Sequence, residues 1–335
     1  MGSVDIRYIA ARAGVSAATV SRVLNGTKPV SPALRERVLK EVEKYGYRPN
    51  MMARGLIIRR SNLIGVITPN VSGYFHAKMI AGIEETAAKH GYNVIVSNVS
   101  TDFSREKESF RIFTERRVDG IILMHENSPE ELCELLQISE VPIVIASANV
   151  RDHRLPTVGI DDRLAAYDAA AYLLRLGHRR IGAILNDCYS LNTLRREGVS
   201  QAMEKYGLQL DDRWVRIGEC RIADGEKLAA QIFSGSEIPT ALFCVSDEQA
   251  VGAVNCLLER GFRIPEDVSI VGFDDVELSM VSRPKLTTIR QPIEEIGRRA
   301  TLNLLDRLAG KAAQDREILP HMLIVRGSTA PCSKS

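Results

Sequence analysis

Residues 5–26, DIRYIAARAGVSAATVSRVLNG, contain two short amphipathic segments on either side of a glycine. In the first segment, from about Ile6 to Ala13, apolar residues recur on one face, and Asp5 before it is a good helix N-cap. The second segment follows at once, because Gly14 permits a tight turn. Two short helices joined in this way predict a helix-turn-helix, whose second helix can enter the major groove of DNA.

A third amphipathic segment comes soon afterwards. Ser31-Pro32, a capping residue followed by a proline at the first helical position, predicts a helix that runs to about Tyr45 and is stopped by Gly46. The apolar residues of the second and third segments are expected to close a small three-helix core, and they are Val20, Val23, Leu24, Val38, Leu39 and Val42.

Small and polar side chains are expected on the exposed face of the second helix. Hydroxyl groups and an arginine there suit contacts with phosphates or base edges, and alanine suits contacts with thymine methyl groups. The residues concerned are Ser16, Ala17, Ala18, Thr19, Ser21 and Arg22. The alternative is that they only face solvent, because helical hairpins occur in many proteins that never bind DNA.

Composition excludes several classes of protein. The chain has 335 residues, of which 45% are hydrophobic and 26% charged, so it is long enough for two or three packing units and is not a disordered protein. No apolar run approaches the roughly 18 residues that span a bilayer, and the N-terminus lacks the apolar segment of a secretion signal. The six cysteines are scattered without a CxxC pair, which favours reduced core side chains in a cytoplasmic protein.

Charge is distributed unevenly along the chain. Residues 1–60 hold 12 Lys and Arg but only 4 Asp and Glu, a balance of +8, and since the whole chain carries +2, residues 61–335 carry −6. A basic head on an acidic body suits a polyanion partner for the head alone. The alternative is that a small terminal domain carries excess Lys and Arg for solubility.

From Ser61 onward, short apolar strands alternate with amphipathic helices. The first series begins with LIGVIT at 63–68 and ends with VPIVIAS at 141–147, and the second begins near Val158 and ends with VSIVGFD at 268–274. This alternation predicts βαβ units and parallel sheets. Two such series predict two doubly wound α/β lobes, with a ligand bound at the carboxyl ends of the strands in the cleft between the lobes.

The chain resembles the LacI/GalR (lactose repressor) family of transcription regulators in motifs that occur in order: AGVSAATVSRVLNG at 13–26, GYRPNMMARGL at 46–56, LGHRRIG at 176–182, IPEDVSIVGFDD at 264–275 and PKLTTIRQP at 284–292. The resemblance implies a sequence-specific DNA-binding regulator, a repressor under allosteric control by a small molecule. It also implies the fold of periplasmic sugar-binding proteins for the body. In that fold the chain crosses between lobes three times, so the helix after Pro292 is expected to return to the first lobe.

Within the second helix, the resemblance implies that Ala17, Ala18 and Arg22 face bases. It implies that the residues positioning the phosphate backbone are Ser16, Thr19, Ser21 and Asn25. Several family members have larger hydrogen-bonding residues at positions 17 and 18, so less of the DNA sequence is expected to be read there.

Residues 50–58, NMMARGLII, correspond to the hinge helix of the family, which pairs with its partner over the minor groove. Asn50 follows a proline and caps this helix, and Leu56 matches the leucine that wedges into a central base step. Ala53 and Arg54 match the packing and minor-groove positions. Taken alone the segment is a marginal helix, because it is short and contains a glycine, so a simple linker is the alternative.

Three residues carry the implied effector pocket. Phe75 matches the aromatic residue that stacks on effector rings, Arg195 matches the arginine of an R-x-x-G motif, and Asp274 matches the acidic partner of ligand hydroxyls. Asn192 and Asp247 are further candidates. Each has a simpler interpretation, since Phe75 can be a core residue, Arg195 a solvated helix residue and Asp274 a cap.

Two pocket positions depart from the family pattern. Ser246 stands where an asparagine is usual, and Ser147 stands where many sugar-responsive members have an aspartate. Both weaken the prediction of a standard sugar pocket, and a purine or nucleoside effector stays an alternative. Control by a phosphocarrier protein is another alternative. In the family members that are controlled in this way an arginine makes the contact, but this chain has Asn303 at that position.

Enzyme motifs are not found in the sequence. There is no GxGxxG after the first strand, no GxxxxGK[ST], no GxSxG and no HExxH, and the six histidines lack ligand spacing. We expect neither a cofactor nor a metal. Adjacent aspartates point apart in most local geometries, so capping or solvation is the favoured interpretation of Asp161-Asp162, Asp211-Asp212 and Asp274-Asp275.

The sequence therefore predicts a helix-turn-helix domain at 1–49, a hinge at 50–60 and a two-lobed α/β domain at 61–335. The first lobe is expected at about 61–157 plus 292–318 and the second at 158–289 plus 320–330. The expected partners are double-stranded operator DNA, a sugar-like or nucleobase-like effector and a second copy of the chain, with no membrane, in the bacterial cytoplasm at the nucleoid. A leucine-heptad tail is missing, which favours dimers over tetramers. A solute-binding protein of a transporter is the competing hypothesis, but it predicts a signal peptide and no basic head.

Overall fold

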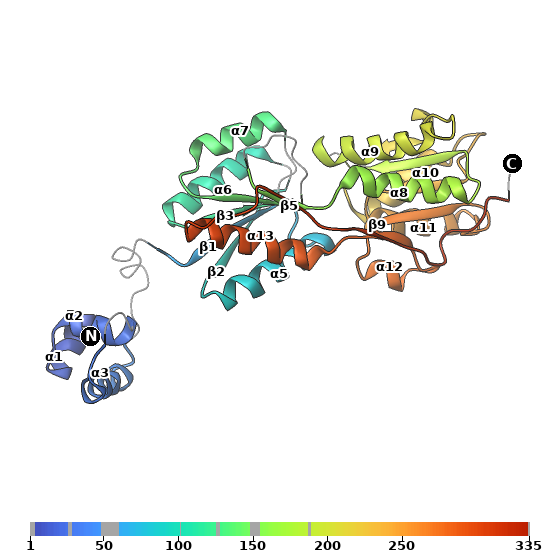
Figure 1. Cartoon of the computed structure of the whole chain (residues 1–335). Coiled ribbons are helices and arrows are strands. Elements are labelled where there is room, and N and C mark those ends of the chain that lie inside the picture. Colours follow the sequence, from blue (N-terminus) through green and yellow to red (C-terminus); the bar gives the residue numbers. More distant parts are fainter. Residues whose placement is uncertain are drawn as a thin grey trace. The chain divides into compact units, whose positions relative to one another are not determined.

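The computed structural model describes residues 4–25, 29–47, 60–100, 102–124, 128–147, 155–186 and 189–333. The chain divides into two units, residues 1–61 and residues 62–335. The described part of the first unit is helical, and the second unit contains two six-stranded sheets (Figure 1).

The first unit has three helices in its described part: α1 (Ile6–Ala13), α2 (Ala17–Asn25) and α3 (Pro32–Lys44). Helix α1 begins after Asp5 because the Asp5 carboxylate accepts a hydrogen bond from the backbone N–H of Tyr8 at 2.7 Å. It ends at Gly14, whose φ of +63° lies in the left-handed region that glycine adopts without strain. The chain can therefore turn directly into α2.

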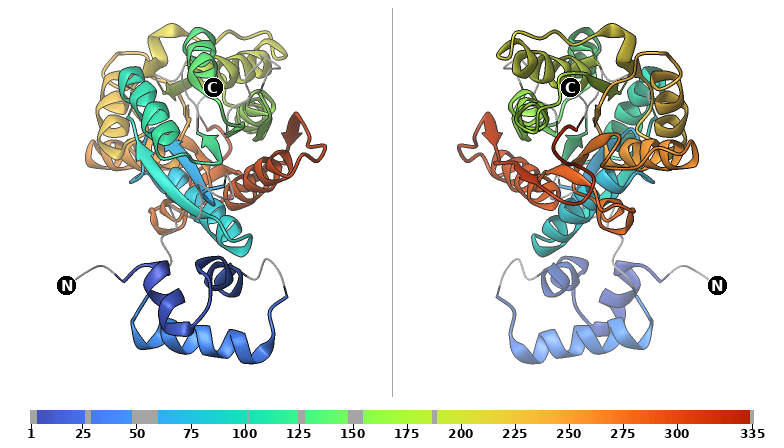
Figure 2. Two further views of the ribbon diagram at one scale, coloured as in Figure 1. Left: turned by 90° about the vertical axis from the view of Figure 1, so that its left-hand side faces the viewer. Right: turned by 90° about the vertical axis from the view of Figure 1, so that its right-hand side faces the viewer.

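These three helices, blue in Figure 2, pack around a small apolar core. The buried members of the core are Ile9, Ala10, Ala13, Val20, Val23 and Val38. Two expectations were wrong. Leu39 is 41% exposed, because it lies about 100° around α3 from the buried Val38. Ser31 stands at the N-cap position of α3, but its side chain caps no backbone N–H of the described helix.

The first lobe of the second unit has a fully parallel sheet with the strand order β11-β5-β4-β3-β1-β2. Its strands are β1 (Leu63–Thr68), β2 (Asn93–Asn98), β3 (Gly120–Leu123), β4 (Ile143–Ala146), β5 (Thr157–Gly159) and β11 (Arg316–Ile318). Its helices are α5 (Tyr74–Lys89), α6 (Phe103–Glu115), α7 (Pro129–Ile138) and α13 (Ile293–Leu308). Helices α6 and α7 cover one face and α5 and α13 the other (Figure 1).

The second lobe has the strand order β12-β10-β9-β8-β6-β7, with only β12 antiparallel to its neighbour among the described pairs. Its strands are β6 (Ile181–Leu185), β7 (Val215–Ile217), β8 (Ala241–Cys244), β9 (Ser269–Asp274), β10 (Thr287–Arg290) and β12 (Met322–Ile324). Its helices are α8 (Asp162–Arg175), α9 (Tyr189–Glu204), the 3-10 turn η1 (Asp212–Trp214), α10 (Ile222–Ile232), α11 (Asp247–Glu259) and α12 (Leu278–Val281). Apolar side chains of α8 and α9 pack on one face and those of α10 and α11 on the other.

The chain passes between the two lobes three times. The crossings lie between β5 and α8, between β10 and α13, and between β11 and β12. The expectation that the helix after Pro292 returns to the first lobe is confirmed, because α13 packs against α5 and β4 there. This connectivity places the carboxyl ends of several strands from both sheets around one site.

Candidate nucleic-acid interface and ligand pocket

Helix α2 presents a small, polar face to solvent. The hydroxyl oxygen of Ser16 accepts a hydrogen bond from the backbone N–H of Thr19 at 3.2 Å, so it caps the helix. Ala18 and Arg22 are exposed and lie four residues apart, on the same face. Ala17 is half-buried against the small core, so it has less surface for a base than Ala18.

The remaining predicted DNA contacts include residues that the structure describes and residues that it does not. Thr19 and Ser21 are half-buried on α2. The hinge positions lie outside the described residues, and they are Asn50, Ala53, Arg54 and Leu56. The side chain of Asn25 also lies outside the described set. The structure therefore bears on the helix-turn-helix part of the predicted interface and not on the hinge.

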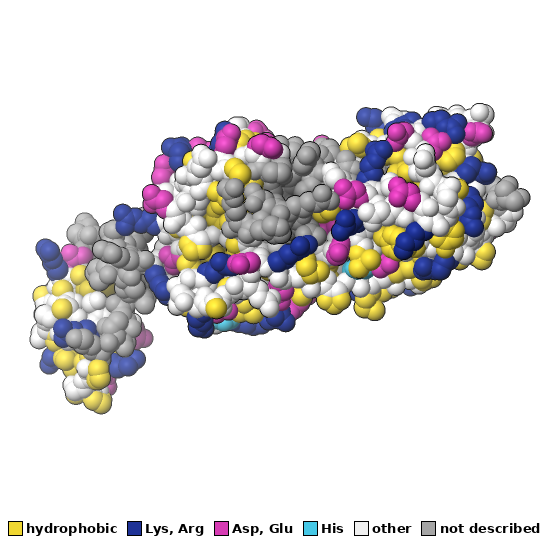
Figure 3. All heavy atoms as spheres, turned by 45° about the horizontal axis from the view of Figure 1, so that its top comes forward, with side chains coloured by type: hydrophobic (Ala, Val, Ile, Leu, Met, Phe, Trp, Pro, Cys, Tyr) yellow, Lys and Arg dark blue, Asp and Glu magenta, His cyan; other side chains and the backbone are white. Residues whose placement is uncertain are grey.

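Charge on the second unit is mixed. On the face seen in Figure 3, Lys and Arg side chains are interspersed with Asp and Glu. On this face the alternation leaves no continuous positive surface for a polyanion among the described residues. The excess of basic residues in the first 60 positions is therefore the feature that suits nucleic acid.

One small cavity is lined from both lobes of the second unit. The first lobe contributes Asn70, Gly73, Phe75, His76 and Ser147. The second lobe contributes Asn186, Arg195, Cys220, Val245, Ser246, Glu248 and Asp274. Most of these residues follow the carboxyl ends of parallel strands, which is where doubly wound folds bind ligands. The enclosed space is about 50 Å³.

Five of the predicted effector residues meet in this cavity: Phe75, Ser147, Arg195, Ser246 and Asp274. Asp247 does not line it. Its carboxylate accepts hydrogen bonds from the backbone N–H of Val276 at 2.9 Å and from the hydroxyl of Thr288 at 2.7 Å, so it ties α11 to the β9 and β10 segments. Burial raises the pKa of Asp247 to about 8. The side chain of Asn192 lies outside the described set.

Arg195 is a buried cation at the wall of this cavity. Its Nε and NH2 groups donate to the same Oδ1 atom of Asp162 at 2.9 and 2.8 Å, and NH1 donates to the carbonyl oxygen of Val245 at 2.6 Å. The guanidinium also lies over the ring of Phe273, 3.8 Å from the ring centre. Three of its five N–H groups are thus engaged by described residues, which leaves two for a ligand.

Asp274 ends strand β9 with a φ of +107°, an unusual conformation for a residue with a side chain. Its Oδ1 atom accepts a hydrogen bond from the Nε2 of Gln291 at 2.7 Å. Burial raises the pKa of Asp274 well above its ordinary value. The next residue, Asp275, is held at 2.6 Å by both Arg290 and Arg326. This anchor fixes the strained turn that presents the Asp274 carboxylate to the cavity.

Sequence reasoning missed several lining residues. Asn186 directly follows β6 and Asn70 lies two residues after β1, so the rule that ligands bind at the carboxyl ends of strands was the signal that could have found them. Glu248 is the second residue of α11; burial raises the pKa of its carboxyl group, and the nearby backbone of Tyr74 in the first lobe opposes this shift. No local pattern predicts that proximity, because the two residues are far apart in the chain.

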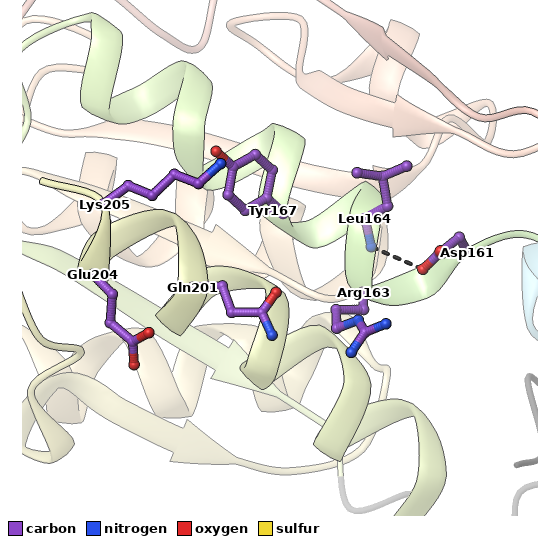
Figure 4. A pocket seen from close by; sticks show the side chains of 7 residues that line it. All are labelled: Asp161, Arg163, Leu164, Tyr167, Gln201, Glu204 and Lys205. Atoms are coloured by element: carbon purple, nitrogen blue, oxygen red, sulfur yellow. Dashed lines mark hydrogen bonds between the residues drawn. The ribbon is translucent and has the colours of Figure 1, made fainter.

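A second hollow lies on the surface between α8 and α9 (Figure 4). Several of its polar groups already have local partners. Asp161 caps α8 by accepting from the backbone N–H of Leu164 at 3.0 Å, and the Lys205 ammonium lies 4.7 Å from the ring centre of Tyr167. We therefore interpret this hollow as an ordinary solvated helix surface.

The aspartate pairs are used in capping and ion pairs. Asp161 and Asp211 cap α8 and η1, while Asp162 pairs with Arg195 and Asp275 with Arg290 and Arg326. Within the described ranges, no cluster of three His, Cys, Asp or Glu side chains is placed to hold a metal ion. Those ranges also contain no helix with the length and apolar character needed to cross a membrane.

Comparison with known proteins matches both units. Residues 5–50 match the model of the bacterial regulatory proteins of the lacI family, and residues 170–329 match a periplasmic binding protein-like domain. The catabolite control protein A of Priestia megaterium is 37% identical over 331 residues, covering 98% of this chain and 99% of that protein. The chain belongs to the LacI family.

Other LacI-family members are similar to this chain in sequence and in structure. The transcriptional repressor CytR of Escherichia coli K12 is 38% identical over 326 residues, covering 97% of this chain and 96% of that protein. A lac repressor dimer, solved bound to operator and the anti-inducer ONPF, has a TM-score of 0.90 at 28% identity, covering 98% of this chain and all of that one. A complex of the regulator CelR with cellobiose has a TM-score of 0.74 at 28% identity, covering 97% of this chain and 100% of that one. These relatives are transcription regulators and not enzymes, and this LacI-family chain is a DNA-binding regulator with a periplasmic-binding-protein-like domain.

Proposed function

We propose that this protein is a dimeric repressor that reads an operator with α2 and is controlled by a small molecule in the cavity between its lobes. The observation that carries the proposal is the placement of Arg195 and Asp274 in one cavity with groups from both lobes. A ligand that contacts both lobes favours one arrangement of the lobes over another. The domain that holds this cavity belongs to the same chain as the helix-turn-helix.

Arg195 and Asp274 together suit a pair of ligand hydroxyls. A hydroxyl accepts one hydrogen bond and donates another, so it can accept from the free N–H groups of Arg195 and donate to the carboxylate of Asp274. Phe75 supplies an apolar face beside them. A sugar or sugar derivative has hydroxyls on its rim and apolar ring faces, and is the effector class that we favour. The ribose of a nucleoside has the same hydroxyls, which keeps a nucleoside as the second candidate.

The cavity must enlarge before it accepts such a molecule. Its enclosed volume of about 50 Å³ is far below the roughly 300 Å³ or more of typical small-molecule pockets. Effector binding is thus expected to move the lobes and, through them, the hinge at 50–60. A coupling free energy of about 1–3 kcal/mol is enough for a roughly 5- to 150-fold change in operator affinity.

The DNA-bound form is expected to be a symmetric dimer. A related lac repressor was solved as a dimer on its operator. Two copies of α2 related by a twofold axis require two half-sites about one turn of DNA apart. We assign base contacts to Ala18 and Arg22, backbone contacts to Ser16, and minor-groove insertion to Leu56. The protein acts on the bacterial chromosome and is placed in the cytoplasm, at the nucleoid.

Control by a phosphocarrier protein is the alternative, and the structure disfavours one form of it. Asn303 is 6% exposed on α13, its amide donates to the carbonyl of Gln314 at 2.7 Å, and its oxygen accepts from Arg307 at 3.0 Å. This side chain holds the turn after α13 and is not presented to a partner protein. The observation favours small-molecule control.

The test is selection of binding sites from a pool of randomised DNA duplexes. The wild-type protein should enrich one near-palindromic sequence, and Arg22→Ala should bind it about 10-fold or more weakly, because a base contact is lost. Arg37→Ala is the matched control, since Arg37 is an exposed arginine on α3 of the same unit. Equal losses in both variants contradict the assignment of α2, and a pool without enrichment contradicts the proposed function.

A further inference from the structure

Two carboxylates line the same cavity. Asp274 of β9 is 6% exposed and Glu248 of α11 is 8% exposed. Gln291 donates an amide N–H to Asp274 at 2.7 Å, which does not neutralise that carboxyl group, and the backbone of Tyr74 lies near Glu248. The His76 side chain also lies near Glu248 and lines the cavity. Both carboxylates are thus removed from water at a place where a ligand must bind.

The one arginine or lysine among the described lining residues already has a counterion. Arg195 directs two N–H groups to the Asp162 carboxylate, which is 1% exposed behind the cavity wall. The positive charge of this guanidinium is thus balanced by one buried carboxylate. Glu248 and Asp274 add two further buried carboxyl groups, and Arg195 also interacts with Asp274, so no arginine or lysine of the described lining is left for an anionic ligand.

Besides the two N–H groups that Arg195 keeps for a ligand, the cavity has an unmet hydrogen-bond acceptor. Asn186, which lines the cavity, is 4% exposed, and its Oδ1 atom has no hydrogen-bond partner among the described residues. A buried acceptor without a donor costs free energy that a ligand N–H or O–H group recovers. Glu248 and Asp274 offer further acceptor oxygens beside it.

We infer that the pocket selects an uncharged or amine-bearing effector rich in O–H and N–H donors, rejects its phosphorylated or carboxylated counterparts, and owes this selection to Glu248. The inference rests on the proposed control by a small molecule at this site and narrows its ligand class. Glu248 acts as a specificity residue, because its carboxyl group lines the ligand space while Arg195 pairs with Asp162. Glu248 lines the cavity together with groups of the first lobe, so it lies at the boundary between the lobes.

Matched ligand pairs test the inference in the full-length protein. The pairs are ribose and ribose 5-phosphate, glucose and glucose 6-phosphate, and cytidine and cytidine 5′-monophosphate, with glucosamine as the amine-bearing probe. Binding is measured by calorimetry and by thermal shift. The unphosphorylated member of at least one pair should bind, and its phosphorylated partner should bind about 100-fold or more weakly, because a buried like charge is strongly unfavourable.

Glu248→Gln removes the charge and keeps the size of the side chain and one acceptor oxygen. It should reduce the discrimination within a pair by about 10-fold, since a lining carboxylate that repels an anion is gone. Glu259→Gln is the control, because Glu259 is an exposed residue at the other end of the same helix, and it should leave the ratio unchanged. The wild-type comparison does not depend on the folding of either variant.

The outcomes separate the inference from the proposed function. A phosphorylated compound that binds the wild type as tightly as its parent overturns the inference alone, and so does a Glu248→Gln protein with unchanged discrimination. A parent compound that binds with the expected selectivity but leaves operator affinity unchanged overturns the proposed function while the inference stands. If no compound of any pair binds, both fail.

Discussion

Arg195 and Asp162 form a buried ion pair in which two guanidinium nitrogens share one carboxylate oxygen, at 2.9 and 2.8 Å. The side chains are 6% and 1% exposed, and the second oxygen of Asp162 has no partner among the described residues. The pair joins the start of α8 to the middle of α9 and orients the guanidinium that faces the cavity. Stability and ligand recognition therefore depend on the same contact.

Asp162→Asn should destabilise the protein. The change leaves the buried Arg195 without a counterion, and removal of one partner of a buried ion pair costs about 3–5 kcal/mol. Urea unfolding measures the free energy of unfolding of the wild type and the variant. Asp212→Asn is the control, because Asp212 pairs with Arg196 on the surface, where its side chain is 80% exposed, and should cost less than about 1 kcal/mol. Equal losses in the two variants would show that burial does not strengthen the pair.

Gly198→Ala should force α8 and α9 apart. A Cβ atom on Gly198 would collide with the carbonyl oxygen of Arg163 in α8. Overpacking of this kind costs about 1–3 kcal/mol, and here it also shifts Arg195, which lies one turn earlier on α9. Gly235→Ala is the control, since a Cβ there meets its nearest atom at 3.5 Å, an ordinary contact, and the change should stay within about 0.5 kcal/mol. The measurement is thermal unfolding together with ligand affinity, and a Gly198→Ala protein as stable as the control would contradict the close packing.

Asp247→Asn should flatten the dependence of stability on pH. Burial raises the pKa of Asp247 to about 8 from an ordinary value of 3.8, so between these values the folded protein binds more protons than the unfolded chain. Stability contributed by this group is therefore present at low pH and lost as the pH rises toward 8. The amide of the Asn variant can still bond with Val276 and Thr288. Between about pH 5 and about pH 8, its free energy of unfolding should fall by roughly 2 kcal/mol less than that of the wild type. Parallel stability curves for the two proteins would rule out a protonated Asp247.

Ser16→Ala should loosen α2 in the first unit. The Ser16 hydroxyl oxygen accepts from the backbone N–H of Thr19, and loss of an N-cap costs about 1 kcal/mol. Ser31→Ala is a matched control, because Ser31 occupies the same position of α3 without a capping hydrogen bond. Hydrogen exchange of α2 amides in the full-length protein should become several-fold faster for Ser16→Ala only. Similar exchange in both variants would mean that the cap contributes little.

Much of the architecture could be predicted because it depends on residues that are close in the chain. The cap at Asp5, the turn at Gly14 and the alternation of strands and helices are local, and they led to three N-terminal helices followed by two α/β lobes. It was harder to predict which residues of a helix are buried. Val38 and Leu39 are adjacent and both apolar, and only the packing of the three helices decided that Leu39 faces solvent. Local periodicity leaves an uncertainty of one residue around a helix, and tertiary contacts remove it.

The sequence by itself determined the basic helix-turn-helix, the two-lobed body and the candidacy of Arg195 and Asp274. Only the tertiary structure distinguished the roles of Asp247 and Asp274. The carboxyl group of Asp247 bonds with Val276 and Thr288, whereas that of Asp274 lines the cavity. It alone brought Asn186 and Glu248 into the site. The physical reason is that burial and charge balance depend on neighbours from distant segments, which no short stretch of sequence contains.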